Sequence, residues 1–201
     1  MSYKIGVRIG SQRSDSLNRK IANALAALAP AGLTFDQIPI GDLPFYNEDL
    51  ETDSPPKQWI EFRRRVKDAD ALLFVTPEYN RSVPGVLKNA IDVGSRPYGK
   101  SVFDGKPAAV VSSSMGNIAG FGANHHLRQS LVFLNTPVLQ QPEAYIANAG
   151  SLFDEGGKLK NESTEKFLRG FIEAFAQWVG KSKALGCHSR AGLRVSFPAK
   201  A

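Results

Sequence analysis

Apolar and polar residues alternate along the chain in a strand-then-helix order. Short apolar runs, which are typical of buried parallel strands, occupy residues 3–9, 33–40, 71–76, 107–114 and a short stretch within 136–146. Helical spacing of apolar residues predicts helices over about 18–29, 56–67, 85–93, 125–134 and 163–181. Five strands with interleaved helices indicate an α/β fold of the doubly wound, three-layer type.

The first and last predicted helices carry the clearest pattern. Apolar side chains recur every three or four residues from Leu17 to Leu28, and Pro30 ends that helix. An aromatic stripe from Phe167 to Trp178 lies on one face of the last helix. Such a stripe is typical of a helix that packs on the core, so we assign these rings to the core rather than to a ligand.

Composition places the chain among ordinary globular domains. It has 201 residues, of which 42% are hydrophobic and 22% are charged, enough for a single domain with a sizeable core. These values exclude a disordered chain and a collagen-like repeat. The one cysteine, Cys187, rules out an intrachain disulfide and lacks a neighbouring base, so we expect an exposed bystander thiol.

Basic charge is concentrated at the C-terminal end. The net charge is +6, yet residues 181–201 contain five Lys or Arg and no Asp or Glu, which leaves residues 1–180 at +1. A nucleic-acid-binding domain needs a basic face, so we expect no nucleic-acid partner. We divide the chain into a folded domain over 1–183 and a basic extension over 184–201, which has no helical period and is expected to lie on the surface or to be disordered. A tail that binds polyanions is the less favoured alternative.

The sequence contains no recognisable targeting or membrane segment. The first apolar stretch is interrupted by Lys4 and Arg8, unlike the apolar region of a secretory signal peptide. No window reaches the roughly 18 apolar residues of a transmembrane helix. We therefore expect a cytoplasmic protein that does not insert into a membrane.

Residues 10–18, with the sequence GSQRSDSLN, are the first candidate for ligand binding. They lie where the first strand ends and the first helix begins, at the edge of an open α/β sheet where ligands bind. Unpaired helix N–H groups, hydroxyl donors and the Arg13 cation suit a phosphate. Because GxGxxG is absent, one terminal phosphate is favoured over a dinucleotide pyrophosphate. The alternative is ordinary helix capping by Ser or Asp.

Two further candidate loops follow the third and fourth strands. Residues 76–85, TPEYNRSVPG, are stiffened by prolines and present backbone polar groups that suit a flat heterocycle, with Tyr79 as a stacking or lining group. Residues 112–117, SSSMGN, add hydroxyls and a glycine. Each loop alone is equally consistent with an ordinary turn. Because the carboxyl ends of parallel strands meet at one edge of a sheet, the three loops together predict a single binding crevice.

Three other patterns carry less weight. Residues 94–101 match the phosphate-binding pattern GxxxxGK[ST], but a predicted helix precedes them and a strand follows, the reverse of a working P-loop. His125 and His126 are adjacent and have no partners at ligand spacing, so we expect no metal site. Arg81, Arg96 and Lys100 are candidates for attracting an anionic substrate.

Four segments occur in the order GSQRSDSLNRKIA, LPFYNEDL, TPEYNRSVPGVLKNAID and SSSMGNIAG. They resemble the NADPH-dependent FMN reductase family, and most closely its bacterial chromate and quinone reductases, from about Lys4 to Lys181. The resemblance implies a flavodoxin-like, five-stranded parallel sheet in the order 2-1-3-4-5, carrying one non-covalent FMN. One departure is Val93, where the family often has tryptophan, and we expect it to alter the cleft wall or a subunit contact.

The resemblance also implies which residues bind the cofactor. The phosphate loop matches at Ser11, Arg13, Ser16, Leu17 and Asn18. The loop against the isoalloxazine ring matches at Pro77, Glu78, Tyr79 and Asn80, and the loop after the fourth strand matches at Ser113 and Gly116. Members of the family form dimers or tetramers with the flavin near a subunit boundary, where a loop matches at Pro44, Tyr46 and Asp49. We therefore expect a homodimer or a homotetramer.

The activity that the resemblance implies is that of an FMN-dependent NAD(P)H oxidoreductase. NADPH or NADH would deliver a hydride to flavin N5, and a quinone, chromate or another small electron acceptor would then be reduced. No side chain is needed as a covalent catalyst, so we name no catalytic residue. One alternative is a flavodoxin-type electron carrier that depends on a partner reductase. Such carriers are usually strongly acidic, so the net charge of +1 over residues 1–180 disfavours this alternative. Another is a DNA- or membrane-associated protein that works through the basic extension.

Overall fold

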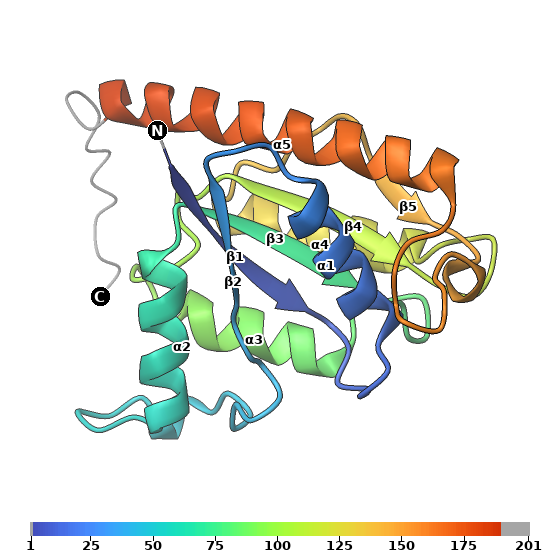
Figure 1. Cartoon of the computed structure of the whole chain (residues 1–201). Coiled ribbons are helices and arrows are strands. Elements are labelled where there is room, and N and C mark those ends of the chain that lie inside the picture. The colour runs from blue at the N-terminus through green and yellow to red at the C-terminus, as the bar shows by residue number, and fades with distance from the viewer. Residues whose placement is uncertain (1, 190–201) are drawn as a thin grey trace.

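Five parallel strands form the centre of the molecule (Figure 1). The structure is a computed structural model that describes residues 2–189, and their side chains through residue 185. The strands are β1 Tyr3–Ile9, β2 Leu33–Gln37, β3 Ala71–Thr76, β4 Ala108–Ser113 and β5 Ala144–Ile146. They are hydrogen-bonded in the order β2-β1-β3-β4-β5, and every neighbouring pair is parallel. The predicted fold class and strand order are confirmed.

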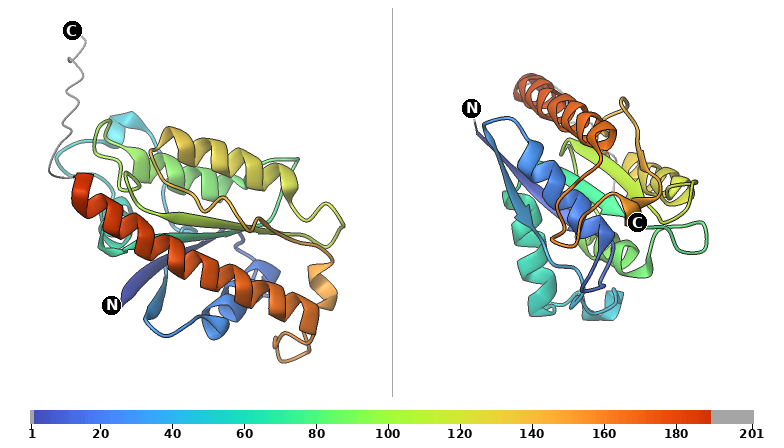
Figure 2. Two further views of the ribbon diagram at one scale, coloured as in Figure 1. Left: turned by 90° about the horizontal axis from the view of Figure 1, so that it is seen from above. Right: turned by 45° about the vertical axis from the view of Figure 1, so that its right-hand side comes forward.

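Helices cover both faces of the sheet (Figure 2). Their bounds are α1 Leu17–Leu28, α2 Lys57–Asp68, α3 Gly85–Ser95, α4 Phe121–Phe133 and α5 Glu162–Ser189, with short 3-10 turns η1 Glu48–Leu50 and η2 Ala149–Ser151. Helices α1 and α5 pack on one face, and α2, α3 and α4 pack on the other. Both faces of β3 are therefore buried, which explains its uninterrupted apolar sequence.

Each face of the sheet has its own core, because successive side chains of a strand point to opposite faces. On the α1–α5 face, Val7 of β1 packs in one cluster with Phe171 and Phe175, which confirms the predicted role of these rings. Phe167, at the start of the stripe, is instead 37% exposed. On the other face, Phe74 of β3 packs in a second cluster with Trp59 of α2. Because all five strands are parallel, their carboxyl ends lie at one edge of the sheet, and the two cores fix the sheet from both faces.

Three element boundaries differ from the predictions. Strand β2 ends at Gln37 rather than at residue 40, since Pro39 cannot donate to a sheet ladder. Helix α4 begins at Phe121, four residues earlier than expected. Helix α5 continues to Ser189, so residues 184–189 of the predicted extension are helical, consistent with the high helix propensity of Ala184 and Leu185. The Cys187 side chain and residues 190–201 lie outside the described part of the chain.

Candidate functional site

The three loops predicted to bind a ligand meet at the carboxyl edge of the sheet, on the right of Figure 1. A Cβ on Gly10 would lie 2.8 Å from Thr76 Oγ1, so the first and second loops touch where a side chain would not fit. Ser113 Oγ donates a hydrogen bond to Asn18 Oδ1 over 3.0 Å, which ties the third loop to the start of α1. We call residues 10–18, 76–85 and 112–117 together the loop cluster.

The first loop ends in a helix start that favours an anion. Ser16 caps α1 by accepting a hydrogen bond from Arg19 N, as the capping alternative predicted. The first turn of α1 contains no acidic residue, and the Arg13 side chain beside it is exposed. Lys20 Nζ lies 2.6 Å from Asp15 Oδ1, and this contact lowers the pKa of Asp15 while offsetting its charge. The positive end of the helix dipole is therefore left available to a phosphate.

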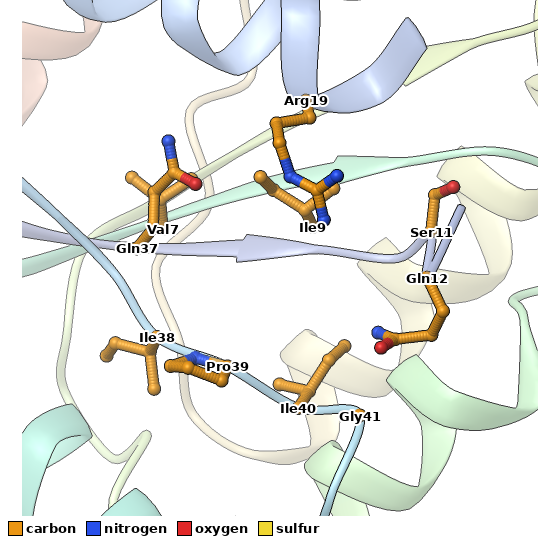
Figure 3. A pocket seen from close by; sticks show the side chains of 10 residues that line it. All are labelled: Val7, Ile9, Ser11, Gln12, Arg19, Gln37, Ile38, Pro39, Ile40 and Gly41. Atoms are coloured by element: carbon orange, nitrogen blue, oxygen red, sulfur yellow. The ribbon is translucent and has the colours of Figure 1, made fainter. Parts of the chain in front are cut away.

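Arg19, which the sequence analysis did not single out, holds the first loop in place. Its Nη1 donates to the backbone oxygens of Arg13 and Ser14, over 3.0 and 3.2 Å. The side chain reaches from α1 into a small pocket between the ends of β1 and β2, with Ser11 and Gln12 on the pocket wall (Figure 3). This contact depends on the folded path of the loop, so no spacing in the sequence points to it.

The second loop is a tight two-residue turn. Tyr79 and Ser82 exchange backbone hydrogen bonds of 2.9 and 3.1 Å, and between them Asn80 and Arg81 have φ values of 50° and 63°. Left-handed backbone in two successive residues other than glycine is unfavourable and is common at functional sites. The turn leaves the Tyr79 side chain 55% exposed, as a lining group requires.

Glu78 anchors the second loop to α4. Its Oε2 accepts a hydrogen bond from Ala123 N over 2.9 Å, at the N-terminus of the helix where a carboxylate is favoured. A Cβ on Gly122 would lie 2.7 Å from Arg81 O and 2.9 Å from Glu78 Oε2, so glycine permits this close approach. The Glu78 side chain is thus committed to α4, and the backbone of residue 78 is what the loop can offer to a ligand.

The third loop is buried at its start and open at its glycine. Ser113 is fully buried, whereas Gly116 is exposed and its N–H donates to Ser114 Oγ. A Cβ on Gly116 would meet no atom nearer than 4.0 Å, which leaves space beside the loop for a flat ring. Val93 is fully buried in the core under α3, so the expectation that it alters a cleft wall is wrong for this chain.

The three predicted substrate-binding cations do not lie together. Arg81 is beside the loop cluster and is exposed, with its guanidinium 3.4 Å from Glu78 Oε1. Arg96 and Lys100 follow the C-terminal end of α3 and lead into β4, which places them toward the opposite edge of the sheet. Of the three, Arg81 alone lies within the loop cluster, although Arg96 lines a groove between α3 and α4 that Ser82 and Val83 of the second loop also line.

Comparison with known proteins decides the family. A family model described as NADPH-dependent FMN reductase matches residues 3–151. The chain belongs to the NADPH-dependent FMN reductase family. It is 58% identical over 183 residues to a quinone reductase from Pseudomonas putida, which covers 91% of this chain and 98% of that protein. It is 46% identical over 179 residues to a 2-hydroxy-1,4-benzoquinone reductase from a Burkholderia species, covering 89% and 97%.

A solved structure supports both the fold and the chemistry. The flavoenzyme NAD(P)H:(acceptor) oxidoreductase FerB from Paracoccus denitrificans has a TM-score of 0.84 and 43% identity, and covers 90% of this chain and 98% of that one. The cofactor of this NADPH-dependent FMN reductase is FMN, and its co-substrate is NAD(P)H.

The loop cluster fits FMN by its donor chemistry. The acid-free start of α1 and the Arg13 cation suit the phosphate. The Asn18–Ser113 hydrogen bond fixes the first loop against the third loop, and the open side of Gly116 leaves room for a planar ring. Among the described residues, no group of three or more His, Cys, Asp or Glu side chains is placed to hold a metal ion. Across the same residues, no helix is long and apolar enough to cross a bilayer.

Proposed function

We propose that this FMN reductase acts as an NAD(P)H-dependent quinone reductase. The observation that carries the proposal is the 58% identity to a quinone reductase over 183 residues. The Ser113–Asn18 hydrogen bond supports it, since it joins the helix start proposed to bind the phosphate to the loop proposed to lie beside the isoalloxazine ring. Two relatives at 58% and 46% identity are named for the reduction of quinones. Chromate and other small acceptors belong to the same proposal, since a reduced flavin can pass electrons to many acceptors.

Two groups of residues would bind the cofactor. The phosphate would be held by the first loop and the helix start, at Ser11, Arg13, Ser16, Leu17 and Asn18. The ring would lie against the second and third loops, at Pro77, Glu78, Tyr79, Asn80, Ser113 and Gly116. Arg13 supplies charge, whereas Asn18 and Ser113 position the loops through their mutual hydrogen bond.

FMN supplies the redox chemistry when bound, by accepting a hydride from NAD(P)H and passing it to the acceptor. The chain contributes orientation and a fixed electrostatic environment. The paired backbone hydrogen bonds between Tyr79 and Ser82 hold the second loop in one conformation, and Glu78 anchors that loop to α4. Arg81, exposed at the edge of the loop cluster, would attract the anionic co-substrate.

We further propose that the protein works as a homodimer or a homotetramer. Arg96 and Lys100 lie away from the loop cluster of their own chain, so they could serve an anionic substrate if a second chain brought them to it. The loop that contains Pro44 and Tyr46 is fixed to α3, where Tyr46 N donates to Asn89 Oδ1 over 2.9 Å, and would lie at the boundary. Light scattering of the purified protein checks this: a monomer at micromolar concentration would contradict it.

A cytoplasmic location is part of the proposal, because NAD(P)H is the electron donor and is held inside the cell. Cell fractionation followed by detection of the protein checks it. Recovery of the protein mainly outside the cytoplasmic fraction would contradict it.

The test of quinone reduction is a steady-state assay with NADH or NADPH and a benzoquinone, without any partner protein. Oxidation of the nicotinamide that depends on the quinone supports the proposal. Flavin reduction only after a separate reductase is added would instead indicate an electron carrier of the flavodoxin type. Arg13→Ala tests the phosphate loop, since an unchanged affinity for FMN would contradict the role given to Arg13.

A further inference from the structure

Three aromatic side chains near the loop cluster gather into a partly exposed group. Phe121 is the first residue of α4, His125 lies one turn later, and Tyr145 is the middle residue of β5. The ring centroid of Phe121 lies 4.2 Å from that of His125 and 5.4 Å from that of Tyr145. Phe121 is 51% exposed, although a large apolar ring is usually buried. We call these three residues the aromatic cluster.

The aromatic cluster begins at the point where the second and third loops approach each other. A Cβ on Gly120, just before Phe121, would lie 3.1 Å from Ser112 Cβ at the end of β4. A Cβ on Gly122, just after Phe121, would lie 2.7 Å from Arg81 O in the second loop. The backbone at Phe121 therefore lies between the two loops proposed to hold the flavin ring, and Tyr145 lies beside Ser112 at the start of the third loop.

Contacts within the aromatic cluster hold its rings in position. Tyr145 Oη lies 3.0 Å from His125 Nε2. Burial and a hydrogen bond with Glu143 raise the pKa of Tyr145 to about 12, so its hydroxyl keeps its proton at neutral pH. A preformed set of rings loses little conformational freedom when it stacks on a ligand, which favours binding.

We propose that the aromatic cluster is the subsite for the adenine ring of NAD(P)H. This inference rests on the proposed function, in which the nicotinamide of the same molecule lies over the flavin. NAD(P)H carries two planar ring systems, the nicotinamide and the adenine. In the proposed function the flavin contacts the nicotinamide, which leaves the adenine without a stacking partner. Adenine stacks well on aromatic side chains, and Phe121 offers an exposed ring just outside the loop cluster. The second ring of a fused quinone has the same stacking chemistry, so the experiment must separate these two ligands.

The decisive comparison uses two hydride donors with the FMN-loaded enzyme. NADH contains adenine, and reduced nicotinamide mononucleotide does not. We expect Phe121→Ala to raise the KM for NADH about five- to tenfold, with kcat and the KM for the mononucleotide unchanged. Phe133→Ala is the control, because it removes another exposed phenylalanine ring, 78% exposed, from the far end of the same helix. Tyr145→Phe keeps the ring and should retain most of the affinity for NADH.

A binding measurement provides a readout that does not depend on turnover. Adenosine 5′-monophosphate should give saturation-transfer NMR signals at its adenine protons with the FMN-loaded wild-type protein and with Phe133→Ala. The signals should fall strongly with Phe121→Ala. Since this probe carries no nicotinamide, it tests the subsite even if the wild-type enzyme fails to oxidise NADH, which would contradict the proposed function alone.

Four results would overturn the inference. An equal rise in KM for both donors would mean that Phe121 shapes the flavin site itself, and no rise for NADH would mean that adenine binds elsewhere. A rise in KM confined to a two-ring quinone would assign the aromatic cluster to the acceptor. A change of oligomeric mass with unchanged donor kinetics would assign it to contact with a second chain.

Discussion

Arg8 of β1 places a positive charge in the core, and replacing it with methionine should stabilise the protein. The side chain is 0% exposed, and its guanidinium carbon lies 4.6 Å from the centre of the Phe74 ring and 5.8 Å from that of Phe103. Nη2 donates a long hydrogen bond of 3.3 Å to Gly6 O. Within the described part of the chain, Nε and Nη1 have no hydrogen-bond partner. Burial lowers the pKa of Arg8 to about 9, and the charge of Asp36 opposes this only in part.

The expected gain follows from the size of that fall. Arginine normally has a pKa above 12, and each pKa unit corresponds to about 1.4 kcal/mol, so burial of the cation costs about 4 kcal/mol. Contacts with the faces of desolvated aromatic rings offset about 2 kcal/mol of this. Methionine is flexible, apolar and of similar length. We therefore expect Arg8→Met to raise the free energy of unfolding by about 2 kcal/mol at pH 7.

The pH dependence of this gain has a definite sign. Because the pKa of Arg8 is lower in the folded protein than in the unfolded chain, the full penalty applies below pH 9. Above that pH the folded protein releases the proton first, so the wild type gains stability and the advantage of Arg8→Met shrinks.

Urea unfolding followed by circular dichroism, at a fixed FMN concentration, measures the change. Arg169→Met is the matched control, since Arg169 is half-exposed and pairs with Glu165 at 3.0 Å. Its effect should stay within about 0.5 kcal/mol. A loss of more than about 1 kcal/mol in Arg8→Met would refute the reasoning, because it would show that the buried cation has stabilising partners.

Three further predictions concern the loop cluster and acid stability. Gly122→Ala should weaken FMN binding at least about tenfold in a fluorescence titration, because the added Cβ would clash with Arg81 O in the second loop. Gly170→Ala is the control and should have no effect, since its Cβ meets nothing within 4 Å. Asn18→Ala should weaken FMN binding about tenfold. Adding Ser113→Ala should weaken it little further, because the two substitutions remove the same hydrogen bond, and fully additive losses of affinity would contradict this. Burial acts to raise the pKa of Asp70, but hydrogen bonds from Lys183 Nζ and Lys4 N outweigh it and lower the pKa. Asp70 therefore stabilises the protein above about pH 4 and loses this effect as pH falls, so Asp70→Asn should flatten the fall of Tm in acid, and an unchanged slope would contradict the assignment.

The order of the elements could be predicted because burial leaves a periodic record in the sequence. The apolar run of β3 reflects a strand that is covered on both faces. The aromatic stripe of α5 reflects a helix that buries one face, where Phe171 and Phe175 are fully buried. The three loops of the cluster could be placed together because parallel strands all end at one edge of the sheet.

Features set by contacts between distant residues could not be predicted in this way. Helix α4 begins at Phe121 because the Glu78 carboxylate, 45 residues away, binds Ala123 N, whereas Gly120 and Gly122 alone suggest a loop. The hydrogen bond from Arg19 to the backbone of the first loop depends on how that loop folds, which the spacing of residues in the sequence does not show.

Charged residues were also difficult to place from the sequence. Arg8 interrupts the apolar run of the first strand, and nothing in that pattern shows that its guanidinium is buried against the rings of Phe74 and Phe103. Arg96 is close in sequence to the second loop, yet the whole length of α3 separates it from that loop. Patterns of apolar residues indicate which face of a helix or strand is buried, but they do not show where a long polar side chain lies.

The most direct test of the central claim is a visible absorption spectrum of the purified protein, recorded before and after anaerobic addition of NADPH or NADH. The account predicts a bound flavin whose absorption bleaches on addition of the nicotinamide and returns when a quinone is added. A flavin that does not bleach without a partner reductase would contradict the proposed activity. A colourless protein that also fails to take up added FMN would contradict the assignment of the loop cluster as a flavin site.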